Sequence, residues 1–158
     1  MKRHAQYIKR SLTDFSKSQV IGMANEMGIT KNIVDDLHLT LVYTKTPMKM
    51  PVLDNELLFL SSGYTVENWK TKDGYDILVL VLQDIRPLLE RVDYFKSLGA
   101  TSDFPEFKAH ITLTYDKPIG FSESGHLDKP RFMTFGFSEE VYKDVYESWE
   151  PTLTEEKL

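Results

Sequence analysis

Apolar residues recur at helical spacing in two segments of the chain. From Asp14 to Met27 they fall at intervals of three and four residues, which predicts an amphipathic helix capped near Thr13 or Ser16. The same spacing returns between Asp84 and Gly99. We expect a second helix there, with Asp84 as its capping residue and the glycine at its end.

Other segments have the composition and spacing of strands. The run from Ile77 to Leu82 is apolar without alternation, which predicts a central strand covered on both faces. Asp73 and Gly74 join two extended segments and form a strong hairpin signal. The predicted strands lie at residues 5–8, 37–44, 57–69, 75–83, 109–116, 131–137 and 140–146.

One seven-residue pattern occurs twice. Leu-His-Leu-Thr-Leu-Val-Tyr at 37–43 is answered by Ala-His-Ile-Thr-Leu-Thr-Tyr at 109–115. Because side chains two apart on a strand share a face, each His and its Thr should face one side while the apolar residue between them faces a core. The repeat indicates a paired site made of His38, Thr40, His110 and Thr112.

The tyrosine that ends each copy has the opposite parity. Tyr43 and Tyr115 each follow a threonine by three positions. On a regular strand this spacing places them on the face away from the histidines. We therefore expect both tyrosines to be packing residues.

The order of elements is similar in the two halves of the chain. Each half offers a helix, a loop, a motif strand and a hairpin or strand pair, which indicates a degenerate duplication of an α+β unit. We expect a single domain over residues 1–158, with two antiparallel sheet lobes and flanking helices around a central cleft. The lobes would form around 37–44 and 109–116, place His38 and His110 on opposite walls, and leave 151–158 as a frayed tail.

Composition limits the kinds of site that the chain can build. Its 158 residues include no cysteine, which excludes disulfides and thiolate metal sites. A net charge of -5 argues against a protein that coats duplex nucleic acid, although a pocket can still be locally positive. No apolar run approaches the roughly 20 residues of a membrane span, so we expect a soluble, intracellular protein.

Two imidazoles in one cleft can divide acid–base work, since one can take a proton while the other gives one. The threonine hydroxyls can donate hydrogen bonds to phosphoryl oxygens. A phosphodiester with a neighbouring 2′-hydroxyl carries its own nucleophile, so we expect no metal and no other cofactor. Metal ligation is the weaker alternative, because Asp35 and Asp36 precede the first motif but nothing comparable precedes the second. A purely structural role for the histidines is weaker still.

The paired His-x-Thr strands resemble the two-histidine (2H) phosphoesterase superfamily. That resemblance implies a bilobal α+β fold and metal-independent phosphodiester or cyclic phosphate chemistry, with the four motif residues in the site. Within the superfamily, the chain looks most like the phage anti-CBASS cyclic-oligonucleotide phosphodiesterases. The likeness includes Tyr7 before the first motif, Trp69 between the motifs, and an acidic residue after the second, either Glu139 or Glu140.

Further side chains could hold a nucleotide. Trp69 could stack on a base, which is worth about 1–3 kcal/mol, or could pack at a strand edge. Phe104 or Phe107, in the loop before the second motif, could cover a base. Lys108 has the parity of the second motif histidine and could offset phosphate charge, or be a solvated surface lysine. We expect Trp149 to be a packing residue.

The resemblance implies a metal-independent phosphodiesterase that opens the 3′,5′ bonds of cyclic di- and trinucleotides such as 3′,3′-cyclic GMP-AMP. Its expected setting is the cytoplasm of a phage's host, with a small cyclic nucleotide as partner and neither duplex nucleic acid nor a membrane. Two alternatives stay open: an esterase for RNA 2′,3′-cyclic phosphate ends, and a binding protein that sequesters nucleotides. Which histidine is the base also stays open.

Overall fold

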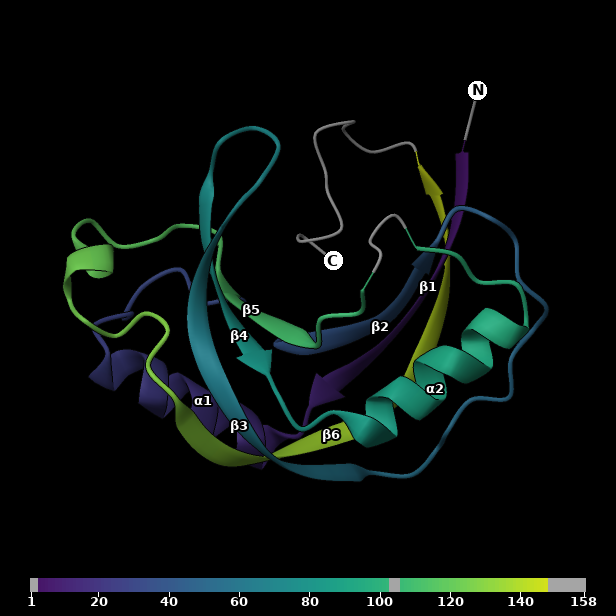
Figure 1. Ribbon diagram of the computed structural model, residues 1–158, viewed down its shortest axis with the longest axis horizontal. Coiled ribbons are helices and arrows are strands. Elements are labelled where there is room, and N and C mark those ends of the chain that lie inside the picture. Colours follow the sequence, from purple (N-terminus) through teal and green to yellow (C-terminus); the bar gives the residue numbers. More distant parts are fainter. Residues whose placement is uncertain (1–2, 103–105, 148–158) are drawn as a thin grey trace.

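The computed structural model describes residues 3–102 and 106–147. Within these ranges the chain forms six β-strands, two α-helices and one 3₁₀ turn (Figure 1). In chain order the elements are β1 (Arg3–Leu12), α1 (Asp14–Glu26), β2 (His38–Thr44), β3 (Leu58–Lys70), β4 (Asp76–Leu82), α2 (Arg86–Ser97), β5 (His110–Thr114), η1 (Phe121–Glu123) and β6 (Arg131–Glu147).

Both predicted helices are present. The capping residue of α1 is one of the two predicted, whereas that of α2 is not the predicted one. α1 begins after Thr13, whose hydroxyl accepts a hydrogen bond from the backbone N–H of Ser16, so Thr13 is the capping residue. α2 begins after Ile85, which makes no side-chain cap. The prediction that Asp84 caps α2 is wrong, because its carboxylate accepts a hydrogen bond from the backbone N–H of Gly63 at 2.9 Å instead.

The two strands predicted at 131–137 and 140–146 form one strand of 17 residues, β6. Its first half pairs with β3 and its second half pairs with β1. Between these halves, the carbonyl of Ser138 accepts a hydrogen bond from the guanidinium of Arg10 at 2.8 Å. This hydrogen bond satisfies a backbone carbonyl at the point where β6 changes its partner from β3 to β1. β6 therefore continues through the polar residues that suggested a break.

The six strands form one closed antiparallel sheet in the order β1-β2-β5-β4-β3-β6. The structure therefore does not have the two separate sheets that the sequence predicts. β6 closes the sheet, because it pairs with both β3 and β1. The two motif strands, β2 and β5, pair through Leu39 and Ile111. In Figure 1, β2 and β5 run across the middle of the molecule, between the β3–β4 hairpin and the ends of β1 and β6.

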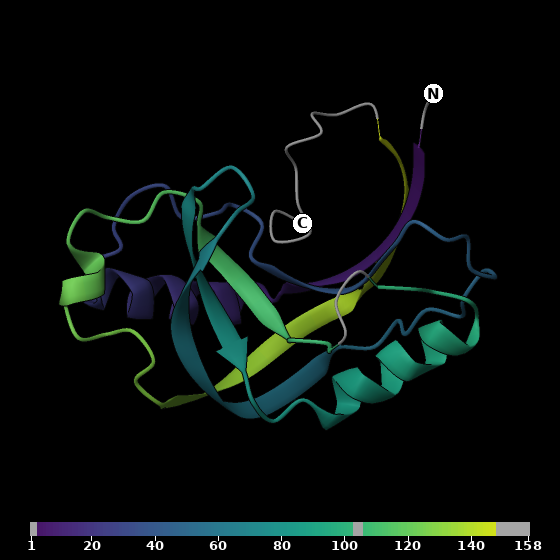
Figure 2. The ribbon, with the colours of Figure 1, turned by 45° about the horizontal axis from the view of Figure 1, so that its top comes forward.

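The hydrophobic core lies on the side of the sheet that carries Leu39 and Ile111, both fully buried. Val20 of α1 and Phe95 of α2 belong to the same core, although the helices lie at opposite ends of the sheet (Figures 1 and 2). In β4, Ile77–Leu80 are fully buried, as predicted for a central strand covered on both faces. This core anchors the motif strands and leaves the His/Thr face directed away from it.

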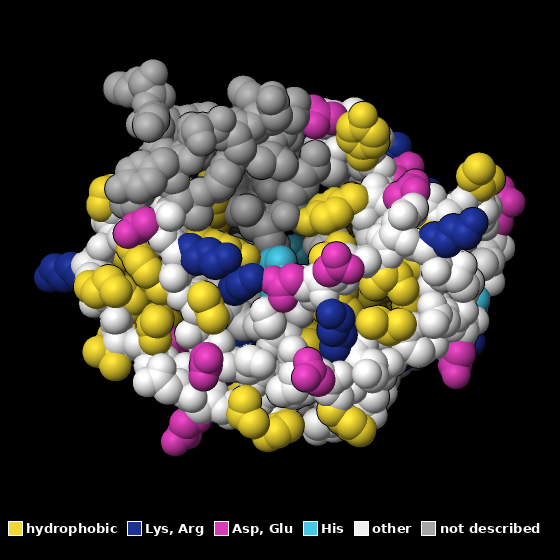
Figure 3. Space-filling view, turned by 180° about the vertical axis from the view of Figure 1, so that it is seen from behind, with side chains coloured by type: hydrophobic (Ala, Val, Ile, Leu, Met, Phe, Trp, Pro, Cys, Tyr) yellow, Lys and Arg dark blue, Asp and Glu magenta, His cyan; other side chains and the backbone are white. Residues whose placement is uncertain are grey.

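The outer surface mixes charges of both signs. On the face shown in Figure 3, basic side chains lie among acidic and hydrophobic ones, and a histidine is visible near the middle between basic and acidic groups. Neither helix in the part of the chain that the structure describes is long and apolar enough to cross a membrane.

Candidate functional site

The two copies of the motif lie on adjacent antiparallel strands. Leu39 of β2 pairs with Ile111 of β5. This register places His38 across from Thr112 and Thr40 across from His110 on neighbouring positions of the same sheet face. The structure thus brings the four predicted motif residues together, and none of their side chains points into the core with Leu39 and Ile111.

The two imidazoles are oriented in the same way. The Nδ1 of His38 lies 2.8 Å from the carbonyl oxygen of Asp36, and the Nδ1 of His110 lies 3.0 Å from the carbonyl oxygen of Lys108. In both cases the acceptor is the residue two positions before the histidine. A carbonyl can only accept, so each Nδ1 carries the proton that it donates, and each Nε2 is left for chemistry on the site face.

Tyr7, which the resemblance singled out, lies against the first histidine. Its hydroxyl is 3.3 Å from the Nε2 of His38. Burial raises the pKa of the Tyr7 phenol, which keeps it protonated and able to donate; the hydroxyl of Thr40 beside it opposes this rise. Among the described residues, the buried Oγ1 of Thr40 has no hydrogen-bond partner of good geometry.

A charged cluster adjoins His38. The carboxylate of Asp36 pairs with Lys9, accepts a hydrogen bond from Ser11 at 2.8 Å, and lies 3.4 Å from the Nδ1 of His38. Partial burial alone would raise the pKa of the Asp36 carboxyl, but the hydrogen bonds from Lys9 and Ser11 outweigh burial and hold that pKa below its usual value. The sequence indicated Asp36 only as a metal ligand and missed this contact with the histidine.

Trp69 lies against the second histidine. Its ring centroid is 4.6 Å from that of His110, with the planes inclined by 51°. The indole Nε1 donates a hydrogen bond to Glu67 at 2.9 Å, and Thr65 donates one to the other carboxylate oxygen at 3.2 Å. The sequence predicted Trp69 at the site but missed Glu67, although the two residues share a face of β3 because they are two apart.

The prediction that Tyr43 faces away from the histidines is wrong, because β2 contains a bulge. Ile8 pairs with Val42 while Lys9 pairs with Thr40, so Leu41 has no opposite residue on β1. One extra residue reverses the alternation of side chains along the strand. Tyr43 consequently pairs with Tyr7 and shares its face of the sheet.

The same irregularity occurs in β5, and it moves Tyr115 in the same way. Val79 pairs with Thr112 while Leu78 pairs with Thr114, which leaves Leu113 without an opposite residue on β4. Tyr115 therefore lies on the same sheet face as Thr112. Burial raises its pKa to about 12 against the opposing effect of the Thr112 hydroxyl, and its own charge raises the pKa of Tyr7. Leucine also occurs in regular strands, so the sequence alone does not reveal the bulge at Leu41 or at Leu113.

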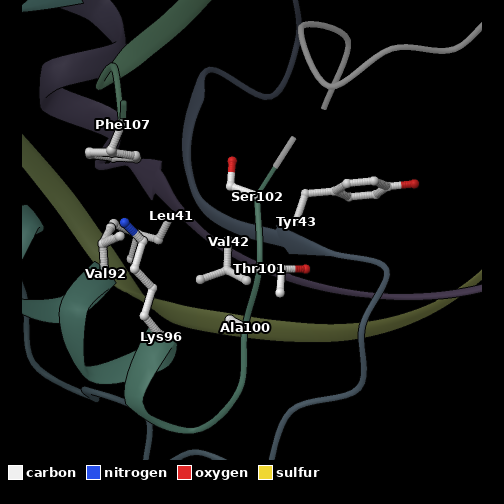
Figure 4. A pocket seen from close by; sticks show the side chains of 9 residues that line it. All are labelled: Leu41, Val42, Tyr43, Val92, Lys96, Ala100, Thr101, Ser102 and Phe107. Carbon is white, nitrogen blue, oxygen red and sulfur yellow. The ribbon is translucent and has the colours of Figure 1, made fainter. Parts of the chain in front are cut away.

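Phe107 and Lys108 come just before His110 in the chain. Phe107 packs against the core and lines a pocket between β2 and α2, where Figure 4 shows its ring on the side of Leu41 and Lys96 while Tyr43 points away. The side chain of Lys108 is exposed, and its carbonyl holds His110.

The structure separates the two glutamates that the sequence left equivalent. Glu139 is exposed, whereas the side chain of Glu140 is buried and pairs with Arg91 at 2.6 Å. Glu140 lies opposite Arg10, which is fully buried, so it belongs to the face of the sheet away from the histidines. Glu140 is therefore a structural residue. Phe104 and Trp149, and the predicted tail at 151–158, lie outside the described residues.

No group of three or more His, Asp or Glu side chains that could hold a metal ion occurs within 3–102 and 106–147. The donors present at the site are imidazole nitrogens, hydroxyls, a carboxylate already engaged by Lys9, and an indole held by Glu67. These groups are suited to proton transfer and to binding an anionic, aromatic ligand.

The chain is similar to known proteins over most of its length. The family model described as "Anti-CBASS protein Acb1" matches residues 4–152. Proteins of that name from Vibrio phage KVP40 and Acinetobacter phage Ac42 are 29% identical over 114 residues and 33% identical over 122 residues. These matches cover 72% and 74% of this chain, and 74% of each relative. The protein of that name from Enterobacteria phage T4 is 39% identical over 89 residues, which cover 56% of this chain and 57% of the T4 protein.

A family model that matches nearly the whole chain is stronger evidence of family membership than any one of these pairwise identities. The relatives that share it come from several phages. The chain belongs to the Acb1 family of anti-CBASS proteins.

Proposed function

We propose that this protein is a phosphodiesterase that opens the 3′,5′ bonds of cyclic di- and trinucleotides such as 3′,3′-cyclic GMP-AMP, and that it thereby protects a phage from CBASS in the host cytoplasm. The observation that carries the proposal is the matched pair of imidazoles on β2 and β5. Both rings donate Nδ1–H to a carbonyl and direct Nε2 to one sheet face. The name of the family and of its phage members supports the setting, because it describes anti-CBASS proteins.

The proposed reaction uses the nucleotide's own hydroxyl. One histidine Nε2 takes the proton from a ribose 2′-hydroxyl, whose oxygen attacks the neighbouring phosphorus. The bond from phosphorus to the 5′-oxygen breaks as the other histidine, which begins the step as an imidazolium, gives its Nε2 proton to that oxygen. The resulting 2′,3′-cyclic phosphate is then hydrolysed by water with the two roles exchanged. Matched Nδ1 contacts on His38 and His110 support this exchange, since neither ring is held in a different tautomer.

The threonines are proposed to bind the reacting phosphate. Thr40 and Thr112 lie on the same face as the histidines, and the buried hydroxyl of Thr40 can donate to a non-bridging oxygen. Lys9 lies opposite Thr40 in the β1–β2 register and pairs with Asp36. The metal-independent reaction of the two-histidine (2H) superfamily belongs to this proposal as well.

The nucleobases are proposed to contact the aromatic side chains around the histidines. Tyr7 and Trp69 each adjoin one histidine, and the bulges in β2 and β5 add Tyr43 and Tyr115 to the same face. Stacking on an aromatic ring tolerates every base and is worth about 1–3 kcal/mol per base. Such a site would accept several cyclic nucleotides.

The test is to incubate the protein with 3′,3′-cyclic GMP-AMP and excess EDTA and to separate the products by chromatography. We expect a linear dinucleotide. An intact nucleotide that stays with the protein would instead identify a sequestering protein, and turnover that is lost only with EDTA would identify a metal site. An RNA that ends in a 2′,3′-cyclic phosphate serves as the second substrate, because preferential opening of that end would support the RNA esterase alternative.

A further inference from the structure

Three side chains on one face of β3 lead to the second motif histidine. Thr65, Glu67 and Trp69 are two residues apart, and each is half-buried, while the neighbouring Tyr64 and Val66 are buried in the core. Thr65 and Trp69 both donate to Glu67, one to each carboxylate oxygen, at 3.2 and 2.9 Å. The indole ring then lies against His110.

Tyr7 and Trp69 contact the motif histidines in different ways. Tyr7 reaches the Nε2 of His38 with a hydroxyl, and this contact fixes the direction of both groups. Trp69 touches His110 only through ring packing at 4.6 Å between centroids. Ring packing is compatible with several orientations of an indole, so the orientation must come from another contact. The hydrogen bond from the indole Nε1 to Glu67 is directional and selects one of them.

We propose that Glu67 is a positioning residue that holds the indole of Trp69 against the imidazole of His110. Both of its carboxylate oxygens are engaged within the strand, so it acts through Trp69 rather than on the substrate. The inference rests on the proposed function for its kinetic readout. Its spectroscopic readout is independent of that function.

The kinetic experiment compares Glu67→Ala, Glu67→Gln and Trp69→Phe for turnover of 3′,3′-cyclic GMP-AMP. Glu67→Ala should lower kcat by roughly 10- to 100-fold, the range for a misplaced group near the reacting centre. Glu67→Gln should stay within about threefold of wild type, because an amide oxygen still accepts from the indole N–H. Phenylalanine has no N–H, so Glu67→Ala added to Trp69→Phe should cost little more than Trp69→Phe alone.

The spectroscopic experiment uses a Trp149→Phe background, because the chain has two tryptophans. In that background Glu67→Ala should raise the acrylamide quenching constant of Trp69, and Glu67→Gln should leave it close to the parent value. Thermal unfolding of each variant shows that the protein compared is folded. If the alanine variant does not fold, the glutamine and phenylalanine variants still decide the matter: a glutamine variant as slow as Trp69→Phe overturns the proposal.

Unchanged kcat and quenching in Glu67→Ala would overturn the proposal, and so would costs that simply add in the double variant. If the wild-type protein leaves cyclic GMP-AMP intact, the proposed function fails, and the quenching comparison alone then decides whether Glu67 holds the indole.

Discussion

Replacing Glu140 by Gln should destabilise the protein without removing a substrate contact. The Glu140 side chain has no exposed area, and its two oxygens accept hydrogen bonds from Arg91 at 2.6 and 2.8 Å and from the backbone N–H of Asp54 at 2.8 Å. These hydrogen bonds also raise the pKa of Arg91. The change would remove the negative charge and leave the guanidinium facing an amide.

The size of the loss follows from the burial of the two partners. Removing one partner of a buried ion pair costs about 3–5 kcal/mol. The Arg91 side chain is 26% exposed, so water can solvate the remaining charge in part, and we expect a loss near the lower end, about 3 kcal/mol. For a chain of 158 residues this lowers Tm by roughly 6–12 °C.

Thermal and urea unfolding followed by circular dichroism would measure this loss. Glu139→Gln is the matched control, because Glu139 is the exposed neighbour on the same strand and its change should stay within about 0.5 kcal/mol. Replacing Arg91 and Glu140 together by Met should recover part of the loss, since no unpaired charge is left. A Glu140→Gln variant that unfolds like the wild type, whether or not it loses turnover, would refute a stabilising role for Glu140.

Three further predictions concern the tyrosines, the core and the charged cluster. Because the folded pKa of Tyr115 is raised from 10.0 to about 12, its contribution to stability is complete below pH 10 and is lost as the pH rises toward 12; Tyr115→Phe should flatten this alkaline loss in urea titrations. Leu39→Ala should cost about 2–5 kcal/mol in urea unfolding because Leu39 is fully buried, whereas Ile119→Ala at an exposed position should cost under about 0.5 kcal/mol. The folded pKa of Asp36 is lowered, so its contribution to stability is present above its usual pKa of 3.8 and is lost as the pH falls below that value. Asp36→Asn should cost at most about 1 kcal/mol at pH 7, because the side chain is 47% exposed. The difference in stability between this variant and the wild type should shrink in acid.

The paired site could be predicted from sequence because its signal is local. A strand has a period of two, so a buried Leu39 or Ile111 between a histidine and a threonine is enough to put both polar side chains on one face. Glu67 could have been found by the same rule, since it lies two residues before Trp69 on a predicted strand.

The positions of the two tyrosines could not be predicted in this way. They depend on bulges at Leu41 and Leu113, which arise from how β2 and β5 pair with their neighbours. A bulge reverses the parity of everything after it, and a leucine in a strand does not reveal one. The choice between the two glutamates failed for a related reason: the partners of Glu140, Arg91 and Asp54, are distant in sequence.

The joining of the predicted lobes into one sheet was also hidden from local patterns. It requires β6 to pair with β3 along its first half and with β1 along its second. Each half looks like a complete strand of ordinary length, because typical strands have about 5–6 residues. Only the pairing partners show that the two segments are continuous.

The most direct measurement is the initial rate of 3′,3′-cyclic GMP-AMP cleavage, in EDTA, by the wild-type protein, His38→Ala, His110→Ala and the double variant. Two imidazoles that act on one phosphorus predict that each single change lowers kcat by ~10²–10⁴, and that the double change costs much less than the product of the two, because the histidines work as a unit. Wild-type turnover in either single variant would contradict the account.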